Sequence, residues 1–125
     1  MPVIRIQALP QSPDIDVGEI MGRIGAKVAA IVERPPHAVW TLWETIEPGR
    51  FVEGDVPAHR QPKTSHPPVA TVTLLEGRSQ DKIERVLTTI AEELTQGLGL
   101  EPGNAFVSYI EVAKGQVFTG GSIRR

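Results

Sequence analysis

The segment PVIRIQAL at residues 2–9 returns as PVATVTLL at residues 68–75, a spacing of 66 residues (68 − 2). Both copies begin with proline and then alternate apolar residues in one phase: Ile4, Ile6 and Ala8 in the first, Ala70, Val72 and Leu74 in the second. A period of two residues is typical of a strand that buries one face. The repeat therefore predicts two similar units, each opening with such a strand.

A second pair of segments matches farther along the chain. The segment HAVWTLWETIEPGRF (residues 37–51) aligns with NAFVSYIEVAKGQVF (residues 104–118) at a spacing of 67 residues (104 − 37). This alignment places Glu44 on Glu111 and Phe51 on Phe118, and one inserted residue between the strands would explain the extra step. We expect a second strand in each half, followed by a short hairpin at EPGRF and at AKGQVF.

A helix is predicted between the two strands of each half. In the second half Ser79 is the expected N-cap and Gly97 or Gly99 the stop. Apolar residues recur between them at helical spacing: Ile83, Val86, Leu87, Ile90 and Leu94.

The helix of the first half has weaker signals. Asp14 or Asp16 caps it, and Pro35 with Pro36 ends it. Its apolar positions are Ile20, Ile24, Ala26, Val28, Ile31 and Val32. Gly18, Gly22 and Gly25 each weaken a helix by about 1 kcal/mol relative to alanine, and close packing on a sheet would explain them.

These elements define the expected fold class. A single α/β (α+β) domain over residues 1–125 contains two strand-helix-strand repeats, at about 2–54 and 68–121, joined by a Pro-rich linker at 55–67. A helix between two strands favours parallel pairing with a right-handed crossover, so both helices cover one face of a four-stranded sheet. The other face carries apolar residues, among them Val3, Leu9, Val69 and Leu75, and we expect other subunits to cover it.

Composition narrows the class of function. The 125 residues carry a formal charge of −2, which offers no basic field for nucleic acid. There is no cysteine, and the three histidines have no metal-ligand spacing, so no metal site is expected. No segment has the pattern of a signal peptide or the length of a membrane span. We expect a cytoplasmic protein that binds small molecules or copies of itself.

At this point the residues match a known family. The segment VATVTLLEGRSQDKIERVLTTIAEELTQGLGLEPGNAFVSYIEVAKGQVFTGG (residues 69–121) resembles the short subunit of 4-oxalocrotonate tautomerase, above all in LLEGRS at the helix start and in AKG followed by GG. The first half resembles the same unit through its early proline and its PGRF hairpin. The chain is similar to fused tautomerase-superfamily proteins of the cis-3-chloroacrylic acid dehalogenase and macrophage migration inhibitory factor branches. The resemblance implies a homotrimer of tautomerase/MIF-like chains.

The resemblance also implies catalytic roles. Pro2, once Met1 is removed, would be a general base that moves a proton between carbon and oxygen without a cofactor. An apolar pocket and a nearby guanidinium would lower the pKa of its amine. Arg78 lies on the family arginine that binds a carboxylate or an enolate oxygen. The duplicate site should be inactive, because Pro68 is inside the chain and Gln11 or Ser12 stands where the arginine is needed.

The chain departs from the family at the strand position that carries a second arginine, which is Trp40 in one half and Phe106 in the other. Leu75 replaces the second arginine of the dehalogenases, and Phe118 keeps the aromatic residue of the hairpin. These four residues are candidates for substrate binding. They predict an apolar pocket suited to a 2-oxo monoacid or its enol, such as phenylenolpyruvate.

Other residues could supply the missing second arginine: Arg5, Arg50 or the tail at Arg124 and Arg125. Some of the candidate positions also have purely structural interpretations. Trp40 and Trp43 are typical core or interface residues, and His37 is typical of a surface or turn.

The expected function is therefore that of an enzyme, a keto-enol tautomerase and hence an isomerase, which acts on a 2-oxo acid. One alternative is a hydratase or dehalogenase of an unsaturated acid, in which a protonated Pro2 acts as an acid. Another is a non-catalytic trimeric binding protein with the same fold.

Overall fold

The computed structural model describes all residues from Met1 to Arg125. The first half contains β1 (Val3–Ala8), α1 (Val17–Ile31), the 3₁₀ turn η1 (Pro36–Ala38), β2 (Trp40–Thr45), β3 (Phe51–Glu53) and β4 (Val56–Ala58). The second half contains β5 (Val69–Leu75), α2 (Gln80–Leu98), β6 (Phe106–Val112), β7 (Phe118–Thr119) and β8 (Ser122–Ile123). None of the helices has the length and apolar character needed to cross a membrane.

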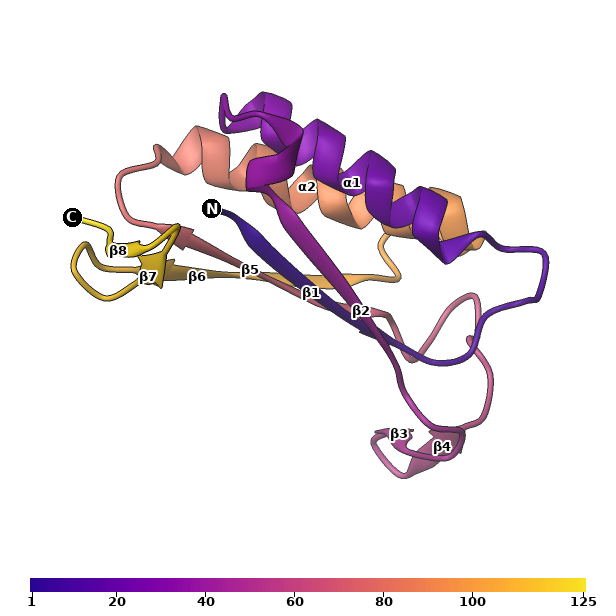
Figure 1. The fold of residues 1–125 in the computed structure, drawn as a ribbon. Coiled ribbons are helices and arrows are strands. Elements are labelled where there is room, and N and C mark those ends of the chain that lie inside the picture. The colour runs from indigo at the N-terminus through magenta and orange to yellow at the C-terminus, as the bar shows by residue number, and fades with distance from the viewer.

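The main sheet has four strands in the order β2-β1-β5-β6. β1 pairs with β2, and β5 with β6, in parallel, while the two central strands β1 and β5 are antiparallel. Figure 1 shows α1 and α2 side by side over one face of this sheet. The predicted arrangement of two β-α-β units with both helices on one face is therefore confirmed.

The strand phase expected from the repeat is also confirmed. The six alternating residues of β1 and β5 are at most 1% exposed and pack under the helices: Ile4, Ile6, Ala8, Ala70, Val72 and Leu74. Leu9, expected on the uncovered face, is instead fully buried within the chain just beyond the end of β1. That part of the prediction was wrong because the strand alternation ends at Ala8.

The opposite face of the sheet is open. Trp40 pairs with Val3 and Phe106 with Val69, so these residues share that face. Four large apolar side chains on it are at least 50% exposed: Trp40, Leu42, Phe106 and Ile110. An exposed apolar surface of this kind is typical of an interaction site.

The register of the outer strands corrects one alignment made from the sequence. Because Val3 pairs with Trp40 and Val69 with Phe106, the spacing of 66 continues into β2 and β6. Glu44 pairs with Gln7 on the open face, whereas Glu111 pairs with Leu74 on the helix face. The two glutamates are therefore not equivalent and no inserted residue separates the strands, since a slip of one residue reverses the face.

The first hairpin lies farther along the chain than expected. β3 pairs with β4, so residues 56–58, assigned to the linker, form the second strand of the hairpin. The hairpin therefore follows the PGRF segment instead of coinciding with it.

The helix caps agree with the sequence. The carboxylate of Asp16 accepts a hydrogen bond from the backbone N–H of Glu19, and the hydroxyl of Ser79 accepts one from that of Lys82. α2 ends at Gly99, which has a left-handed conformation. Ala26, expected in the core, is exposed, and Ala29 takes its place.

The close approach between helices occurs at a different glycine from those expected. A Cβ atom on Gly97 of α2 would lie 2.8 Å from Ile20 of α1, whereas Gly22 has no neighbour within 4 Å and Gly25 only an ordinary contact. Thus Gly97 allows α1 and α2 to pack closely, and packing does not explain the glycines of α1.

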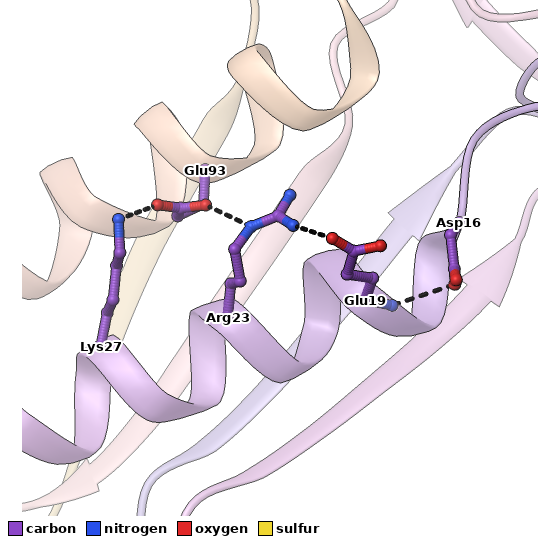
Figure 2. A network of polar contacts seen from close by, with 5 residues as sticks. All are labelled: Asp16, Glu19, Arg23, Lys27 and Glu93. Carbon is purple, nitrogen blue, oxygen red and sulfur yellow. Dashed lines mark hydrogen bonds and ion pairs between the residues drawn. The ribbon is translucent and has the colours of Figure 1, made fainter.

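A polar network also joins the two helices. Glu93 of α2 is 6% exposed, and its carboxylate accepts hydrogen bonds from Lys27 and Arg23 of α1. Arg23 also donates to Glu19 one turn earlier, as Figure 2 shows. These charge-assisted bonds lower the pKa of Glu93 below its ordinary value, although burial acts in the opposite direction. One buried carboxylate therefore links the two halves of the chain.

Candidate active site

A cavity of about 490 Å³ lies where the start of β1 meets three other segments. Its wall comprises Met1 at the start of the chain, Arg34, His37, Ala38 and Trp40 after α1, Leu75 and Arg78 after β5, and Thr119, Gly120 and Arg124 in the β7–β8 hairpin. The volume is within the range of small-molecule sites. Segments far apart in the sequence thus form one pocket.

Met1 lines this pocket, whereas Pro2, the next residue, is buried and does not belong to its wall. The ring of Pro2 is under 2% exposed, and its carbonyl oxygen accepts a hydrogen bond of 2.9 Å from the N–H of Trp40. The α-amino group of Met1 is partly buried, and burial lowers its pKa, as do the guanidiniums of Arg34, Arg78 and Arg124. An amine at this position is therefore less readily protonated than an ordinary chain terminus.

Arg78 owes its position to the turn between β5 and α2. Gly77, with φ of +112°, reverses the chain in a conformation that other residues rarely adopt, and Ser79 then caps the helix. Arg78 is partly buried, and its Nη1 donates a long hydrogen bond of 3.4 Å to the carbonyl oxygen of Leu75. The EGRS segment therefore places a guanidinium beside the start of a helix, where anions are favoured.

Arg34 is positioned by the end of α1. The N–H of Glu33 donates to the carbonyl of Ala30, and the N–H of Arg34 donates to that of Ala29, a Schellman ending. Glu33 adopts φ of +58°, a conformation normally left to glycine or asparagine. Its carboxylate pairs with Lys82 of α2 at 3.5 Å. This ion pair connects the turn that carries Arg34 to the first turn of the helix that follows Arg78.

Arg124 comes from the C-terminal hairpin. Gly120 and Gly121 both have positive φ, as a tight two-residue hairpin turn requires. The N–H of Arg124 donates to the carbonyl of Val117, and its own carbonyl accepts from the N–H of Gly115. These backbone bonds hold the hairpin so that Arg124 reaches the cavity.

The three guanidiniums have no negative partner in the protein. No Asp or Glu lines the cavity, and the ion pairs of the chain do not include Arg34, Arg78 or Arg124. No group of three or more His, Asp or Glu side chains is arranged to hold a metal ion. The cavity wall thus combines the Met1 amine of lowered pKa, three guanidiniums without ion pairs and the imidazole of His37.

The other candidates from the sequence fall in different places. Trp40 and Leu75 line the cavity. Phe106 does not, because it pairs with Val69 at the far end of the sheet, and Phe118 is 68% exposed beside the lining residue Thr119. Within one chain, therefore, only two of the four apolar candidates are near Pro2.

The cavity is more polar than the four apolar candidates predicted, because Arg34, Arg78 and Arg124 also line it. Of the arginines considered as replacements, Arg124 lines the cavity, whereas Arg5 and Arg50 line other cavities. Sequence reasoning missed Arg34. It assigned His37 to a surface or turn, and His37 is indeed exposed in the turn η1, where it also lines the cavity. The double proline before His37 marked a turn, but nothing in the local pattern showed which loop that turn would face.

Solved structures of other proteins share this fold, although comparisons of the sequence find no match. No family model and no curated protein matches the sequence. Among solved structures, Pt0534 inactivated by 2-oxo-3-pentynoate has a TM-score of 0.84 at 14% identity, covering 98% of this chain and 94% of that one. A wild-type fused 4-OT described as a symmetric trimer has a TM-score of 0.82 at 10% identity, with the same coverages. N1, of the cis-3-chloroacrylic acid dehalogenase family, has a TM-score of 0.76 at 13% identity, covering 98% and 83%.

These similarities define the class of structure. The chain has the fold of the tautomerase superfamily over nearly its whole length, as the resemblance of the sequence implied. This chain contains two β-α-β units in one polypeptide, and the fused 4-OT is similar to it over nearly the whole chain.

Proposed function

We propose that this protein is a cofactor-independent tautomerase that interconverts the enol and keto forms of a 2-oxo acid. Removal of Met1 frees the Pro2 amine, which acts as general base, while Arg78 holds the substrate carboxylate. The observation that supports this most is the shared cavity, which Met1 and Arg78 both line and where burial and guanidiniums lower the pKa of the α-amino group of Met1, the residue directly before Pro2. A base that is neutral near pH 7 is what proton transfer requires.

The reaction needs only one proton to move. The neutral amine takes the proton from the enol oxygen, the electrons of the O–H bond form the C=O bond, and the C=C pair then accepts the proton from the ammonium at carbon. Arg78 binds the carboxylate through two parallel hydrogen bonds and so orients the enol over the amine. The positive charges around the site also stabilise negative charge as it develops on the enolate oxygen.

The open sheet face supports a trimer. Its four exposed apolar side chains lie on the outer strands, and the similar fused 4-OT is a symmetric trimer. We propose the same assembly here. It also offers Phe106 a place beside a neighbouring chain, where it could contribute to that chain's pocket.

The test begins with the mass of the purified protein, which shows whether Met1 is absent. Ketonisation of phenylenolpyruvate is then followed for wild type and for Arg78→Ala, with Arg85→Ala on the outer surface of α2 as the matched control. Loss of one charged hydrogen-bonding group predicts a drop of about 10- to 100-fold in kcat/KM for Arg78→Ala. Equal rates for Arg78→Ala and Arg85→Ala would rule out an anchoring role for Arg78.

A chemical probe tests the amine directly. 2-Oxo-3-pentynoate, which inactivated the similar Pt0534, has an alkyne conjugated to a ketone, and a neutral amine can add to it. We expect one equivalent to attach to Pro2, as seen by intact mass and peptide mapping. Labelling only at lysines, with Pro2 free and unmodified, would contradict the proposed base.

A second candidate function is hydration or dehalogenation of an unsaturated acid, favoured by the additional arginines in the cavity and by the likeness to N1. No carboxylate of the same chain lines the cavity to activate water. Release of chloride from 3-chloroacrylate, measured beside ketonisation, separates the two functions.

A further inference from the structure

We infer that Glu76 is a positioning residue of the candidate active site, whose carboxylate holds the C-terminal β7–β8 hairpin against the turn that carries Arg78. The hairpin supplies Thr119, Gly120 and Arg124 to the cavity wall, whereas Glu76 does not belong to that wall. The effect on catalysis rests on the proposed function. The contact itself can be tested without turnover.

Glu76 joins two segments that meet beside the cavity. Its Oε1 accepts a hydrogen bond of 3.0 Å from the backbone N–H of Lys114, the second residue after β6. Its own N–H donates at 2.9 Å to the carbonyl oxygen of Val112. Figure 1 shows the hairpin beside the end of β5, where the loop to α2 begins. The pairing of β5 with β6 therefore continues into the loop that contains Arg78.

The contact with Lys114 lies next to the bond that fixes Arg124. The residue after Lys114 is Gly115, with φ of +84°, and its N–H donates to the carbonyl of Arg124. The hairpin has little else to hold it, because its strands have two residues each and none of its residues belongs to the core. A charge-assisted hydrogen bond at its base should therefore affect its position.

The first half of the chain contains a matching turn after β2. Gly49, with φ of +81°, precedes the β3–β4 hairpin, and its N–H donates to the carbonyl of Ala58 on the returning strand. Gly49 and Gly115 are 66 residues apart (115 − 49), as are Ala58 and Arg124 (124 − 58). The two turns are therefore equivalent positions of the repeat.

The hydrogen bond of Glu76 is absent from the matching turn. At the same spacing of 66, Lys114 corresponds to Pro48 (114 − 48) and Glu76 to Pro10 (76 − 10). Pro48 has no N–H to donate, and Pro10 has no side-chain acceptor. The turn thus forms without this bond, and the bond occurs only at the end of the sheet that contains Arg78.

The first measurement is amide hydrogen exchange of the full-length protein, followed by NMR. Glu76→Ala removes the acceptor, and Lys114→Pro removes the donor in a turn that accommodates proline at Pro48. In each variant we expect exchange at Gly115 and Arg124 to become about 10-fold faster, as loss of one charge-assisted bond predicts. Exchange within α2 should not change.

The second measurement separates positioning from folding. A loosened hairpin presents Arg124 less well to the substrate, so in both variants we expect KM for phenylenolpyruvate to rise about 3- to 10-fold, with kcat within about twofold. Partial unfolding would instead lower the amount of active enzyme, and hence the apparent kcat, without changing KM. The double variant should match either single variant, because both changes remove the same bond.

Two matched variants keep the contact. Glu76→Gln retains an acceptor oxygen and Lys114→Ala retains the backbone N–H, so both should stay within about threefold of wild type in exchange and in KM. Unchanged exchange in Glu76→Ala, or additive effects in the double variant, would overturn the contact. Faster exchange with unchanged KM, or no rescue by Glu76→Gln, would overturn the positioning role. If wild type ketonises no enol, the proposed function fails, and exchange alone decides whether Glu76 holds the hairpin.

Discussion

At one end of the sheet Pro2 precedes β1 beside the loop that follows β5, and at the other end Pro68 precedes β5 beside the loop that follows β1. Both prolines are under 2% exposed, and the surrounding elements are related by the repeat. At the Pro2 end these elements frame a cavity of about 490 Å³ whose wall contains Arg78. At the Pro68 end the cavity is only about 280 Å³, and Gln11 and Ser12 line it in place of Arg78.

The linker explains much of this difference. The N–H of Gln61 donates to the carbonyl of Pro10 after β1, and the carbonyl of Lys63 accepts from the N–H of Glu101 after α2. The side chain of Asn104 donates to the carbonyls of Pro62, Lys63 and Ser65, with its shortest bond of 3.0 Å to Lys63. The linker thus bonds to both loops at the Pro68 end, whereas the corresponding loops after α1 and β5 both line the larger cavity at the Pro2 end. The two ends of the sheet therefore differ in their cavities although the elements around them repeat.

The largest effect on activity should come from replacing Pro2 by alanine, with the same replacement of Pro68 as the comparison. Pro2→Ala replaces the secondary amine of the proposed base, and we expect kcat/KM for ketonisation to fall about 10²-fold or more, given the size of general base catalysis. Pro68→Ala makes the same change inside the chain and should leave kcat/KM within about threefold of wild type. Steady-state rates, with intact mass to confirm loss of Met1, provide the measurement. A similar loss in both variants would show that the prolines act through structure alone.

A smaller effect should come from breaking the link between the two halves. Glu93→Gln removes the charge that Arg23 and Lys27 share, and we expect the free energy of unfolding to fall by about 1–3 kcal/mol. Urea denaturation at neutral pH measures this loss. Glu19→Gln, on the exposed part of the same network, is the control and should change stability by less than about 0.5 kcal/mol.

The same carboxylate predicts a dependence on pH. The pKa of Glu93 is lower in the folded than in the unfolded chain, so its contribution is fully present above the ordinary glutamate pKa of about 4.3. It is lost as the pH falls through the lower pKa of the folded state. The stability difference between wild type and Glu93→Gln should therefore shrink in strong acid. A difference that is constant with pH would mean that packing, and not charge, accounts for the loss.

The smallest effect should appear at the linker. Asn104→Ala removes the side chain that donates to three linker carbonyls, and we expect a loss of about 1–2 kcal/mol in unfolding free energy. Activity should stay within about twofold of wild type, because the altered contacts lie at the Pro68 end. A fall in kcat/KM with unchanged stability would show that the linker acts on the distant cavity and would weaken the comparison between the two ends.

The arrangement of the main elements followed from local patterns. Alternation in β1 and β5, helical spacing in α2 and the caps at Ser79 and Gly99 each indicated one structure, and the structure agrees. The prediction failed where the alignment of the two halves could shift by one residue. The alignment of Glu44 with Glu111 was wrong because sequence letters alone do not show which face of a strand a side chain occupies.

The sequence by itself determined the repeat, the strand and helix periodicities and the family resemblance that singled out Pro2 and Arg78. Only the tertiary structure brought Arg34 and Arg124 to the same cavity and left Phe106 at the other end of the sheet. The physical reason is that periodicity and capping are local properties of the chain. The content of a pocket depends on how distant turns face one another, as in the left-handed turn at Glu33 and the glycine hairpin before Arg124.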